Sequence, residues 1–276
     1  MLTLNLIKMN KILLNILLLS SFLLVASCSM DEKQTVTTMH KLVVEDNFDT
    51  DGAPNSNIWN FEIGTGQNGW GNNEMQYYTD RPENIVVADG MLKITARKEA
   101  FMGASHTSAR IFTKGKVDQK FGRIEARIKL PLGKGLWPAF WMLGSDFETV
   151  GWPNCGEIDI MEYLGNNPTS VFGTIHGPGY SGAASISKSY SIPNSRFDTD
   201  FHVFGIEWGE NYINFYVDDV LYNQMTPASV PGEWVFNKPF YIILNVAVGG
   251  NLPGAPNNQT AFPQQMLVDY VRIYEK

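Results

Sequence analysis

The sequence has few of the features that stabilise small secreted domains or attract nucleic acids. Two cysteines among 276 residues cannot supply a disulfide framework. Lys and Arg number 21 against 28 Asp and Glu, and the net charge of −7 argues against a nucleic-acid binder, which needs a basic face. Long runs of Ala, Glu, Lys and Leu are missing, which argues against a helical bundle. Stability must therefore come from a large core.

Apolar and turn-forming residues are abundant instead. Hydrophobic residues make up 44% of the chain and charged residues 18%, a balance that excludes disorder. The 25 glycines and 14 prolines can form many turns. Aromatic residues make up 12%, and in an acidic chain they favour a neutral ligand with flat apolar faces, such as a sugar.

The N-terminal segment has the pattern of an export signal. Lys8 and Lys11 precede an apolar stretch over residues 12–24, which is too short to span a membrane, and small residues follow it. This pattern predicts a signal peptide over residues 1–27. The tetrapeptide Val25-Ala26-Ser27-Cys28 resembles the bacterial lipobox, which implies cleavage before Cys28 and lipidation of that cysteine. Ordinary signal cleavage nearby is the alternative.

The polar residues 28–40 would form a tether between the lipid and the folded part of the chain. We therefore expect an exported protein that is anchored to the bacterial outer membrane or cell surface only through lipid at Cys28. We expect it to be a monomer.

The rest of the chain has the pattern of β-strands. Residues Arg123–Leu130 alternate strictly, with Ile124, Ala126, Ile128 and Leu130 on one face, which predicts a half-buried strand. Residues Phe240–Val248 are apolar except for Asn245 and predict a central buried strand. Further short runs are separated by Gly, Pro and Asn, and no helical periodicity with caps is found. We predict one all-β domain over residues 41–276, an antiparallel sandwich or jelly roll.

Three acidic residues lie within six positions in Glu157-Ile158-Asp159-Ile160-Met161-Glu162. In a regular strand Glu157 and Asp159 share a face, and Glu162 points to the other face. One extra residue in a bulge near Ile160-Met161 would bring Glu162 to the face of the other two acids. Such a set suits glycoside hydrolysis with retention, which needs two carboxyl groups about 5–5.5 Å apart. A solvated acidic strand or a calcium site is the alternative.

The sequence resembles glycoside hydrolase family 16, and within it the laminarinases, which are endo-β-1,3-glucanases. The acidic segment matches the family signature E-x-D-x-x-E, preceded by Trp152-Pro153-Asn154-Cys155-Gly156. The other matching segments are Gly71-Asn72-Asn73-Glu74 with Tyr77-Tyr78, Arg81-Pro82-Glu83-Asn84, Trp137-Pro138-Ala139-Phe140-Trp141-Met142-Leu143, Thr174-Ile175-His176-Gly177-Pro178, residues 245–254 and Val268-Asp269-Tyr270-Val271-Arg272.

The resemblance implies a curved jelly roll (a concanavalin A-like sandwich) whose concave face forms an open substrate cleft. It implies that Glu157 is the nucleophile, Asp159 its partner and Glu162 the acid/base. No cofactor is implied for catalysis. Six further residues resemble substrate-binding residues of the family: Trp137, Trp141, Trp152, Asn72, Arg110 and His176.

Some of these residues have plainer interpretations. One or two of the tryptophans could belong to the core, Arg110 could be a strand-surface charge, and His176 could be a hydrogen-bonded histidine at a strand end. The resemblance also implies a structural calcium ion held by Glu45, Gly90 and Asp269, away from the acids. Asp269 alternates with Leu267, Val271 and Ile273, so an apolar-facing carboxylate there would need a cation or hydrogen-bond donors.

The leading hypothesis is retaining endo-hydrolysis of a laminarin-like β-1,3-glucan. The same fold and mechanism could act on a mixed-linkage β-glucan or a marine galactan, because the acid spacing does not distinguish these substrates. A non-catalytic glucan-binding protein is the third hypothesis, and the presence of all three acids argues against it.

Overall fold

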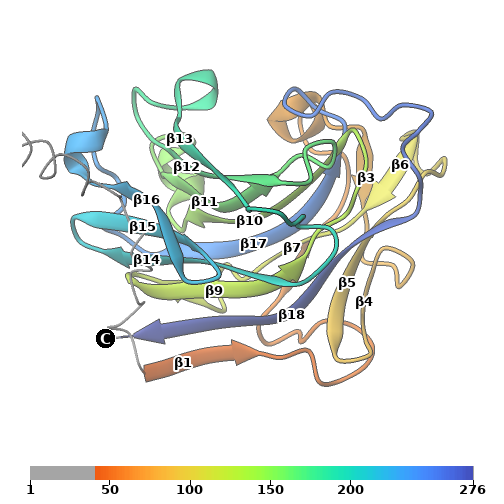
Figure 1. Ribbon diagram of the computed structural model, residues 1–276, viewed down its shortest axis with the longest axis horizontal. Helices are drawn as coiled ribbons and strands as arrows, with labels where there is room; N and C mark the ends of the chain where they lie inside the picture. Colours follow the sequence, from red (N-terminus) through yellow and green to blue (C-terminus); the bar gives the residue numbers. More distant parts are fainter. Residues whose placement is uncertain (1–40, 276) are drawn as a thin grey trace, which may run out of the picture. The chain divides into compact units, whose positions relative to one another are not determined.

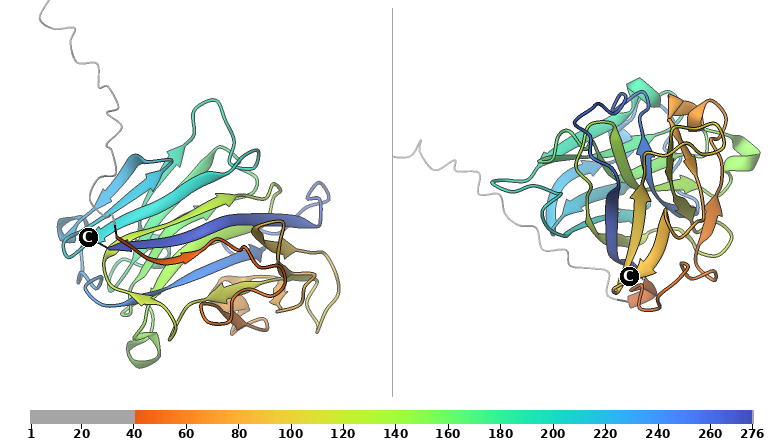
Figure 2. Two further views of the ribbon diagram at one scale, coloured as in Figure 1. Left: turned by 90° about the horizontal axis from the view of Figure 1, so that it is seen from below. Right: turned by 90° about the vertical axis from the view of Figure 1, so that its right-hand side faces the viewer.

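The computed structural model describes residues 41–275. The predicted signal peptide over residues 1–27, the tether over residues 28–40 and the lipidation site at Cys28 lie outside the described residues. Two large antiparallel sheets pack face to face over a common apolar core (Figures 1 and 2), as the sequence predicts. Within residues 41–275 no helix is both long and apolar enough to cross a membrane.

The first sheet has eight strands. Its order is β16-β15-β14-β9-β18-β5-β4, and β1 also pairs with β18. Figure 1 shows β1 and β18 lying side by side at one edge of the molecule. The bounds are β1 Lys41–Asp46, β4 Ile85–Ala88, β5 Met91–Ala96, β9 Gly122–Lys129, β14 His202–Gly209, β15 Tyr212–Val217, β16 Val220–Met225 and β18 Gln264–Glu275.

The second sheet also has eight strands and carries the predicted acids. Its order is β13-β12-β11-β10-β17-β7-β2, and β8 pairs with β17. All nine residues of β17 are buried, which confirms the predicted central strand. The bounds are β2 Asn60–Glu62, β7 Arg110–Phe112, β8 Asp118–Gln119, β10 Leu136–Gly144, β11 Glu157–Tyr163, β12 Ser170–His176, β13 Ile186–Ser191 and β17 Phe240–Val248.

Helical and minor elements are short. Two strands, β3 Gln76–Tyr78 and β6 His106–Ser108, form a small parallel pair. One α-helical turn, α2, covers Phe147–Val150. Three other turns are η1 Gly69–Asn73, η2 Gly182–Ala184 and η3 Pro227–Ser229.

Strand β9 differs in one respect from the predicted half-buried strand. Its core face is as predicted, with Ile124, Ala126 and Ile128 fully buried. The opposite face is also buried at Arg123 and Glu125, which are 6% and 7% exposed. Arg123 Nε donates to Glu125 at 2.6 Å and its Nη2 to Asp219 at 2.8 Å, and this ion pairing lets both charges lie out of water.

Strand β18 corrects the prediction for Asp269. Val268 pairs with Ile128 and Tyr270 with Arg127, so Asp269 is an extra residue in a bulge. The bulge reverses the alternation, and Val268 and Val271 face the core on either side of it. Asp269 therefore does not face the core, and its carboxylate pairs with Arg127 at 2.7 Å.

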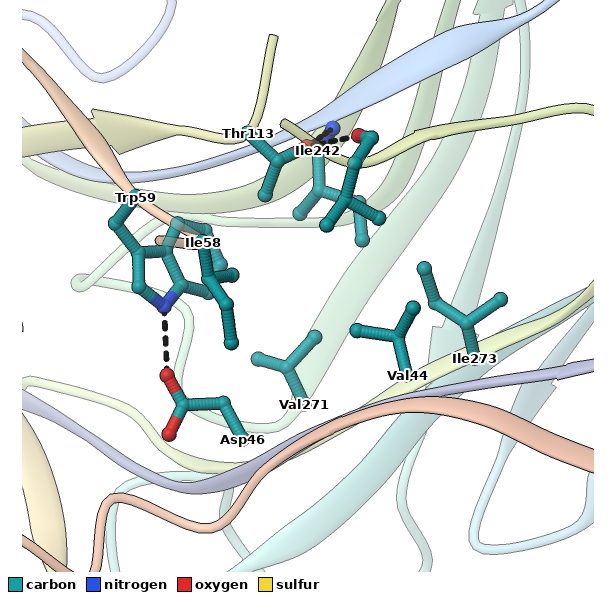
Figure 3. A pocket seen from close by; sticks show the side chains of 9 residues that line it. Val44, Asp46, Ile58, Trp59, Thr113, Ile242, Val271 and Ile273 are labelled. Atoms are coloured by element: carbon teal, nitrogen blue, oxygen red, sulfur yellow. Dashed lines mark hydrogen bonds between the residues drawn. The ribbon is translucent and has the colours of Figure 1, made fainter. Parts of the chain in front are cut away.

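A small cavity lies where β1 meets the core (Figure 3). Most of its lining is aliphatic, and the indole of Trp59 donates to Asp46 at 2.8 Å. None of the three predicted catalytic acids lines this cavity. This cavity is therefore not part of a site built on those acids.

Candidate active site

A β-bulge in β11 places the three acids on one face. Phe140 of β10 pairs with Met161 and the next residue, Trp141, pairs with Asp159, so Ile160 has no partner of its own. The predicted bulge is confirmed. Ile158, Ile160 and Met161 are buried in the core, and Glu157, Asp159 and Glu162 point to the outer face.

Strand register arranges this outer face, which we call the catalytic face, in rows that cross the sheet. Residues paired across antiparallel strands point to the same side. Aromatic, cationic and amide groups lie on one side of β11, and hydroxyl groups and Phe172 lie on the other. The row through Glu162 contains Glu62, Arg110, Asn245, Ala139, Glu162, Phe172 and Ser189; the row through Asp159 contains Asn60, Phe112, Ile243, Trp141, Asp159, Thr174 and Ser187.

Asp159 is the most buried of the three acids, with 3% of its surface exposed. Its Oδ2 lies 3.1 Å from Nε2 of His176. Burial raises the pKa of Asp159 well above its usual value, and the charges of Glu157 and Glu162 raise it further. Contact with His176 opposes the rise but does not cancel it.

Glu162 and Glu157 have different surroundings. Trp137 Nε1 donates to Oε1 of Glu162 at 3.2 Å and Thr174 Oγ1 donates to Oε2 at 3.3 Å. Burial, followed by the charge of Glu157, raises the pKa of Glu162, which favours a protonated acid. Glu157 accepts a hydrogen bond of 2.7 Å from Trp152 Nε1, which stabilises a carboxylate. A carboxyl group with a raised pKa beside a second carboxyl group that accepts an indole N–H supplies the pair of groups that glycoside hydrolysis requires.

His176 lies against the acids. Its Nε2 is 3.1 Å from Asp159 and 3.8 Å from Glu157, and its Nδ1 accepts the backbone N–H of Gly182 at 3.1 Å. Burial lowers the pKa of His176, but the three carboxylates outweigh it and raise the pKa to about 9. The Gly182 N–H can donate to Nδ1 only in the neutral ring, because the charged ring carries a proton on both nitrogens, so the charge of the ring is coupled to the loop at η2.

The three predicted tryptophans lie on or beside the catalytic face, and none is buried in the core. Trp137 and Trp152 each donate to an acid, and Trp152 is 45% exposed. Trp141 donates through Nε1 to Asn245 Oδ1 at 2.7 Å. Partly exposed indole rings beside carboxyl groups can stack on sugar rings.

Arg110 and Asn72 are both held by neighbours. The Arg110 guanidinium lies 4.8 Å from the ring of Trp70 and 4.8 Å from the ring of Trp141, and it pairs with Glu62. It is therefore more than a strand-surface charge. Asn72 Nδ2 donates to Glu74 Oε1 at 3.4 Å.

Sequence reasoning missed several residues that hold the predicted site residues in place. Glu62, Trp70, Glu74, Thr174 and Asn245 all contact predicted site residues. Asn245 offered a signal, because it is the one polar residue in the predicted buried strand β17. Glu62 offered none, because its pairing with Arg110 depends on the register of β2 with β7.

The predicted calcium positions do not form a cluster of carboxylates. Among the described residues, Glu157, Asp159 and His176 are the one group of three potential metal ligands, with their atoms within 4.8 Å of one another. Hydrolysis by paired carboxyl groups needs no metal there. Glu45 pairs with Arg272 at 2.7 Å, as Asp269 does with Arg127.

Comparison with known proteins gives consistent results. Residues 72–272 match the family described as Glycosyl hydrolases family 16. A beta-glucanase from Rhodothermus marinus is 41% identical over an alignment 285 positions long, gaps included, and the alignment covers 99% of each chain. An endo-beta-1,3-glucanase structure from Pyrococcus furiosus is 50% identical with a TM-score of 0.82, covering 85% of this chain and 94% of that one. The laminarinase catalytic domain from Thermotoga maritima is 51% identical with a TM-score of 0.81, covering 86% and 98%.

Proposed function

Because this chain belongs to family 16 of the glycosyl hydrolases and is thus a glycoside hydrolase, we propose that it cleaves β-1,3-glucan chains internally, with retention. The observation that carries this proposal is the bulge at Ile160, which places Glu157, Asp159 and Glu162 on one face. The Pyrococcus and Thermotoga enzymes support the choice of glucan, because their names specify β-1,3-glucanase or laminarinase activity.

The proposed reaction has two steps. In the first, the Glu157 carboxylate attacks the anomeric carbon while Glu162 gives its proton to the glycosidic oxygen, so the leaving sugar departs as an alcohol and a glycosyl ester remains on Glu157. In the second, Glu162 takes a proton from water, the water oxygen attacks the anomeric carbon, and the bond from that carbon to Glu157 breaks, which releases Glu157 as a carboxylate. Two inversions give net retention.

Charge coupling supports the change of role at Glu162. The negative charge of Glu157 is one of the causes that raise the pKa of Glu162 and of Asp159. In the glycosyl ester that charge is gone, so the pKa of Glu162 falls and the residue becomes the base that the second step needs. Asp159 lies between the two glutamates in the sequence, and its raised pKa would keep a proton on it that can be shared with Glu157.

The geometry of the catalytic face supports internal cleavage. The row through Glu162 crosses seven strands, which at about 4.8 Å between strands is roughly 29 Å. Such a row can hold several sugar units on both sides of the scissile bond. We place sugars on Trp137, Trp141 and Trp152.

The experiment is a reducing-sugar assay with product sizing on residues 29–276. The substrates are laminarin, mixed-linkage glucan, agarose and a β-1,4-glucan. We expect laminarin to be cleaved fastest, with an early mixture of short oligosaccharides. If agarose is cleaved faster than laminarin, the glucan assignment is wrong, while the retaining mechanism through Glu157 and Glu162 still holds. If no polymer is cleaved, a glucan-binding protein is favoured.

Export and anchoring form a separate proposal. The sequence before residue 41 supports a lipoprotein attached through Cys28 to the outer membrane or cell surface. The wild-type protein expressed in a Gram-negative host should partition into detergent, and Cys28→Ser should partition into the aqueous phase. Sedimentation of residues 29–276 tests the expected monomer.

The structural calcium ion is a further proposal, and the residues present fit it only in part. Glu45 on β1 pairs with Arg272 of β18. Leu92, two residues after Gly90, pairs with Val268 of β18. The strands that carry or follow Glu45 and Gly90 therefore pair with β18 on either side of Asp269 in its sequence. An ion bound to the Asp269 carboxylate would compete with Arg127, which pairs with that carboxylate at 2.7 Å. A higher melting temperature in calcium than in EDTA, abolished by Asp269→Asn, supports the ion; equal melting temperatures contradict it.

A further inference from the structure

A chain of hydrogen bonds runs from the catalytic face into the molecule. Trp141 Nε1 donates to Asn245 Oδ1 at 2.7 Å, and Asn245 Nδ2 donates to the hydroxyl oxygen of Tyr78 at 3.1 Å. The Tyr78 hydroxyl then donates to Oε2 of Glu74 at 3.2 Å. The chain therefore joins a tryptophan beside Asp159 to an acid outside the reacting set.

The direction of this chain is fixed by chemistry. An indole N–H can only donate, so Asn245 must present its oxygen to Trp141 and its amide nitrogen to Tyr78. The Tyr78 oxygen accepts that bond, and its single hydrogen goes to Glu74. Only a group that accepts can end the chain, and the Glu74 carboxylate does so while also accepting from Gln76 Nε2 at 2.6 Å.

The two middle members of the chain, Tyr78 and Asn245, are buried, so breaking one of their hydrogen bonds would leave a buried polar group without a partner. Tyr78 and Gln76 have no exposed surface, and Asn245 is 6% exposed. A buried donor or acceptor that loses its partner destabilises its arrangement by its full desolvation cost. Burial raises the pKa of Glu74, and its hydrogen-bond donors together with Arg110 oppose that rise.

Both ends of the chain reach residues that face the proposed substrate. At one end Trp141 is also held on its ring face, because the Arg110 guanidinium lies 4.8 Å from it. At the other end Glu74 Oε1 accepts from Asn72 Nδ2 at 3.4 Å. Trp141 thus has one edge and one face fixed, and the amide of Asn72 is oriented by the same carboxylate.

We propose that Glu74 is a positioning residue, which orients Trp141 through Tyr78 and Asn245 and orients Asn72 directly before the glucan binds. The inference rests on the proposed function, since it assigns sugar contacts to Trp141 and Asn72. Glu74 itself touches no reacting atom. It fixes the orientations of Trp141 and Asn72 before the glucan binds, which reduces the conformational entropy that these side chains lose on binding.

Two conservative substitutions separate the two arms. Tyr78→Phe removes the hydroxyl that links Asn245 to Glu74 and leaves the bond to Asn72 intact. Glu74→Gln keeps an acceptor for Tyr78 and Gln76 and turns an amide N–H₂ toward Asn72, so only the second arm is lost. Tyr216→Phe is the matched control, because Tyr216 donates to the carboxylate of Glu207 at 3.0 Å on the first sheet and is equally buried, at 4% exposed.

We expect Tyr78→Phe and Glu74→Gln each to raise KM for laminarin about tenfold with kcat nearly unchanged, the scale of one buried hydrogen bond. Tyr216→Phe should lower the melting temperature by a similar amount and leave KM unchanged. If all three variants change KM alike, or if Tyr78→Phe and Glu74→Gln alter only stability, the positioning role is wrong.

A double-mutant cycle gives a readout that a purely structural role would not move. Trp141→Phe removes the indole N–H at the start of the chain, so Tyr78→Phe should have little further effect on KM in that background. Independent, multiplying effects would overturn the proposal. If the wild type cleaves another glucan and not laminarin, the substrate assignment is wrong but the positioning role of Glu74 is still open to test. The same double-mutant cycle is then measured on the glucan that is cleaved.

Discussion

Thr174 donates its hydroxyl hydrogen to Glu162 while its oxygen lies 2.8 Å from the hydroxyl of Ser187. A threonine hydroxyl has one hydrogen, so Ser187 must be the donor in the second bond. The edge strand β13 therefore supports the acid on β11 through one intervening side chain. This support favours the ionised form of Glu162 and opposes the rise in its pKa that burial causes.

Thr174→Val should move the alkaline limb of the pH–activity profile to higher pH. The first step needs Glu162 protonated, so activity is lost as the pH rises through its pKa. Removing a donor to the carboxylate raises that pKa, and the loss then occurs at higher pH. The measurement is kcat/KM for laminarin against pH. Ser191→Ala is the control, because the Ser191 hydroxyl lies 2.7 Å from that of Ser170 on the same face and contacts none of the three acids. If the alkaline limb of Thr174→Val has the same apparent pKa as that of the wild type, Glu162 does not have the proposed role.

Glu157→Gln should abolish hydrolysis and retain binding. The amide cannot attack the anomeric carbon, so we expect kcat to fall by at least about a thousandfold. Trp152 can still donate to the amide oxygen, so the site keeps its shape. Calorimetry with a laminarin oligosaccharide tests binding, and near-normal turnover would show that another group is the nucleophile.

His176→Gln should remove a pH-dependent part of the stability. Burial lowers the pKa of His176, and the Asp159, Glu157 and Glu162 carboxylates raise it from 6.5 to a net value of about 9. A histidine with a raised folded-state pKa stabilises the protein fully below pH 6.5, and this contribution is lost as the pH rises through about 9. Urea unfolding should therefore show the stability advantage of wild type over His176→Gln shrinking across that range. An advantage that is constant with pH would contradict the coupling to the acids.

The strands and the acids could be predicted from sequence because both depend on local patterns. The apolar run of β17 and the alternation in β9 are visible without a partner strand, and the spacing of Glu157, Asp159 and Glu162 requires a bulge if they act together. The error at Asp269 had a local cause that sequence does not reveal, since a bulge reverses the alternation of β18.

The contacts that sequence could not supply join distant segments. Arg123 can be buried because Glu125 on its own strand and Asp219 on another hairpin both pair with it. Asn245 is oriented by Tyr78 and Trp141 from two other strands. Such partners are set by sheet order and register. Composition and periodicity do not determine either one.

Removing Ile160 tests the bulge that creates the site. Ile160 is the extra residue of the bulge, so deleting it leaves a regular strand in which Met161 follows Asp159, and Glu162 still shares the outer face with Glu157 and Asp159. We expect the deletion variant to fold and to keep measurable laminarin turnover, because all three acids still share one face and the pairing of β11 with β10 becomes regular. Ile160→Val keeps the bulge and removes one buried methyl group, so it should cost about 1 kcal/mol of stability and leave kcat unchanged. Urea unfolding and laminarin turnover of both variants make the comparison. A folded deletion variant without activity would show that a common face is not sufficient, and that the bulge also sets the spacing between Glu157 and Glu162 that the reaction needs.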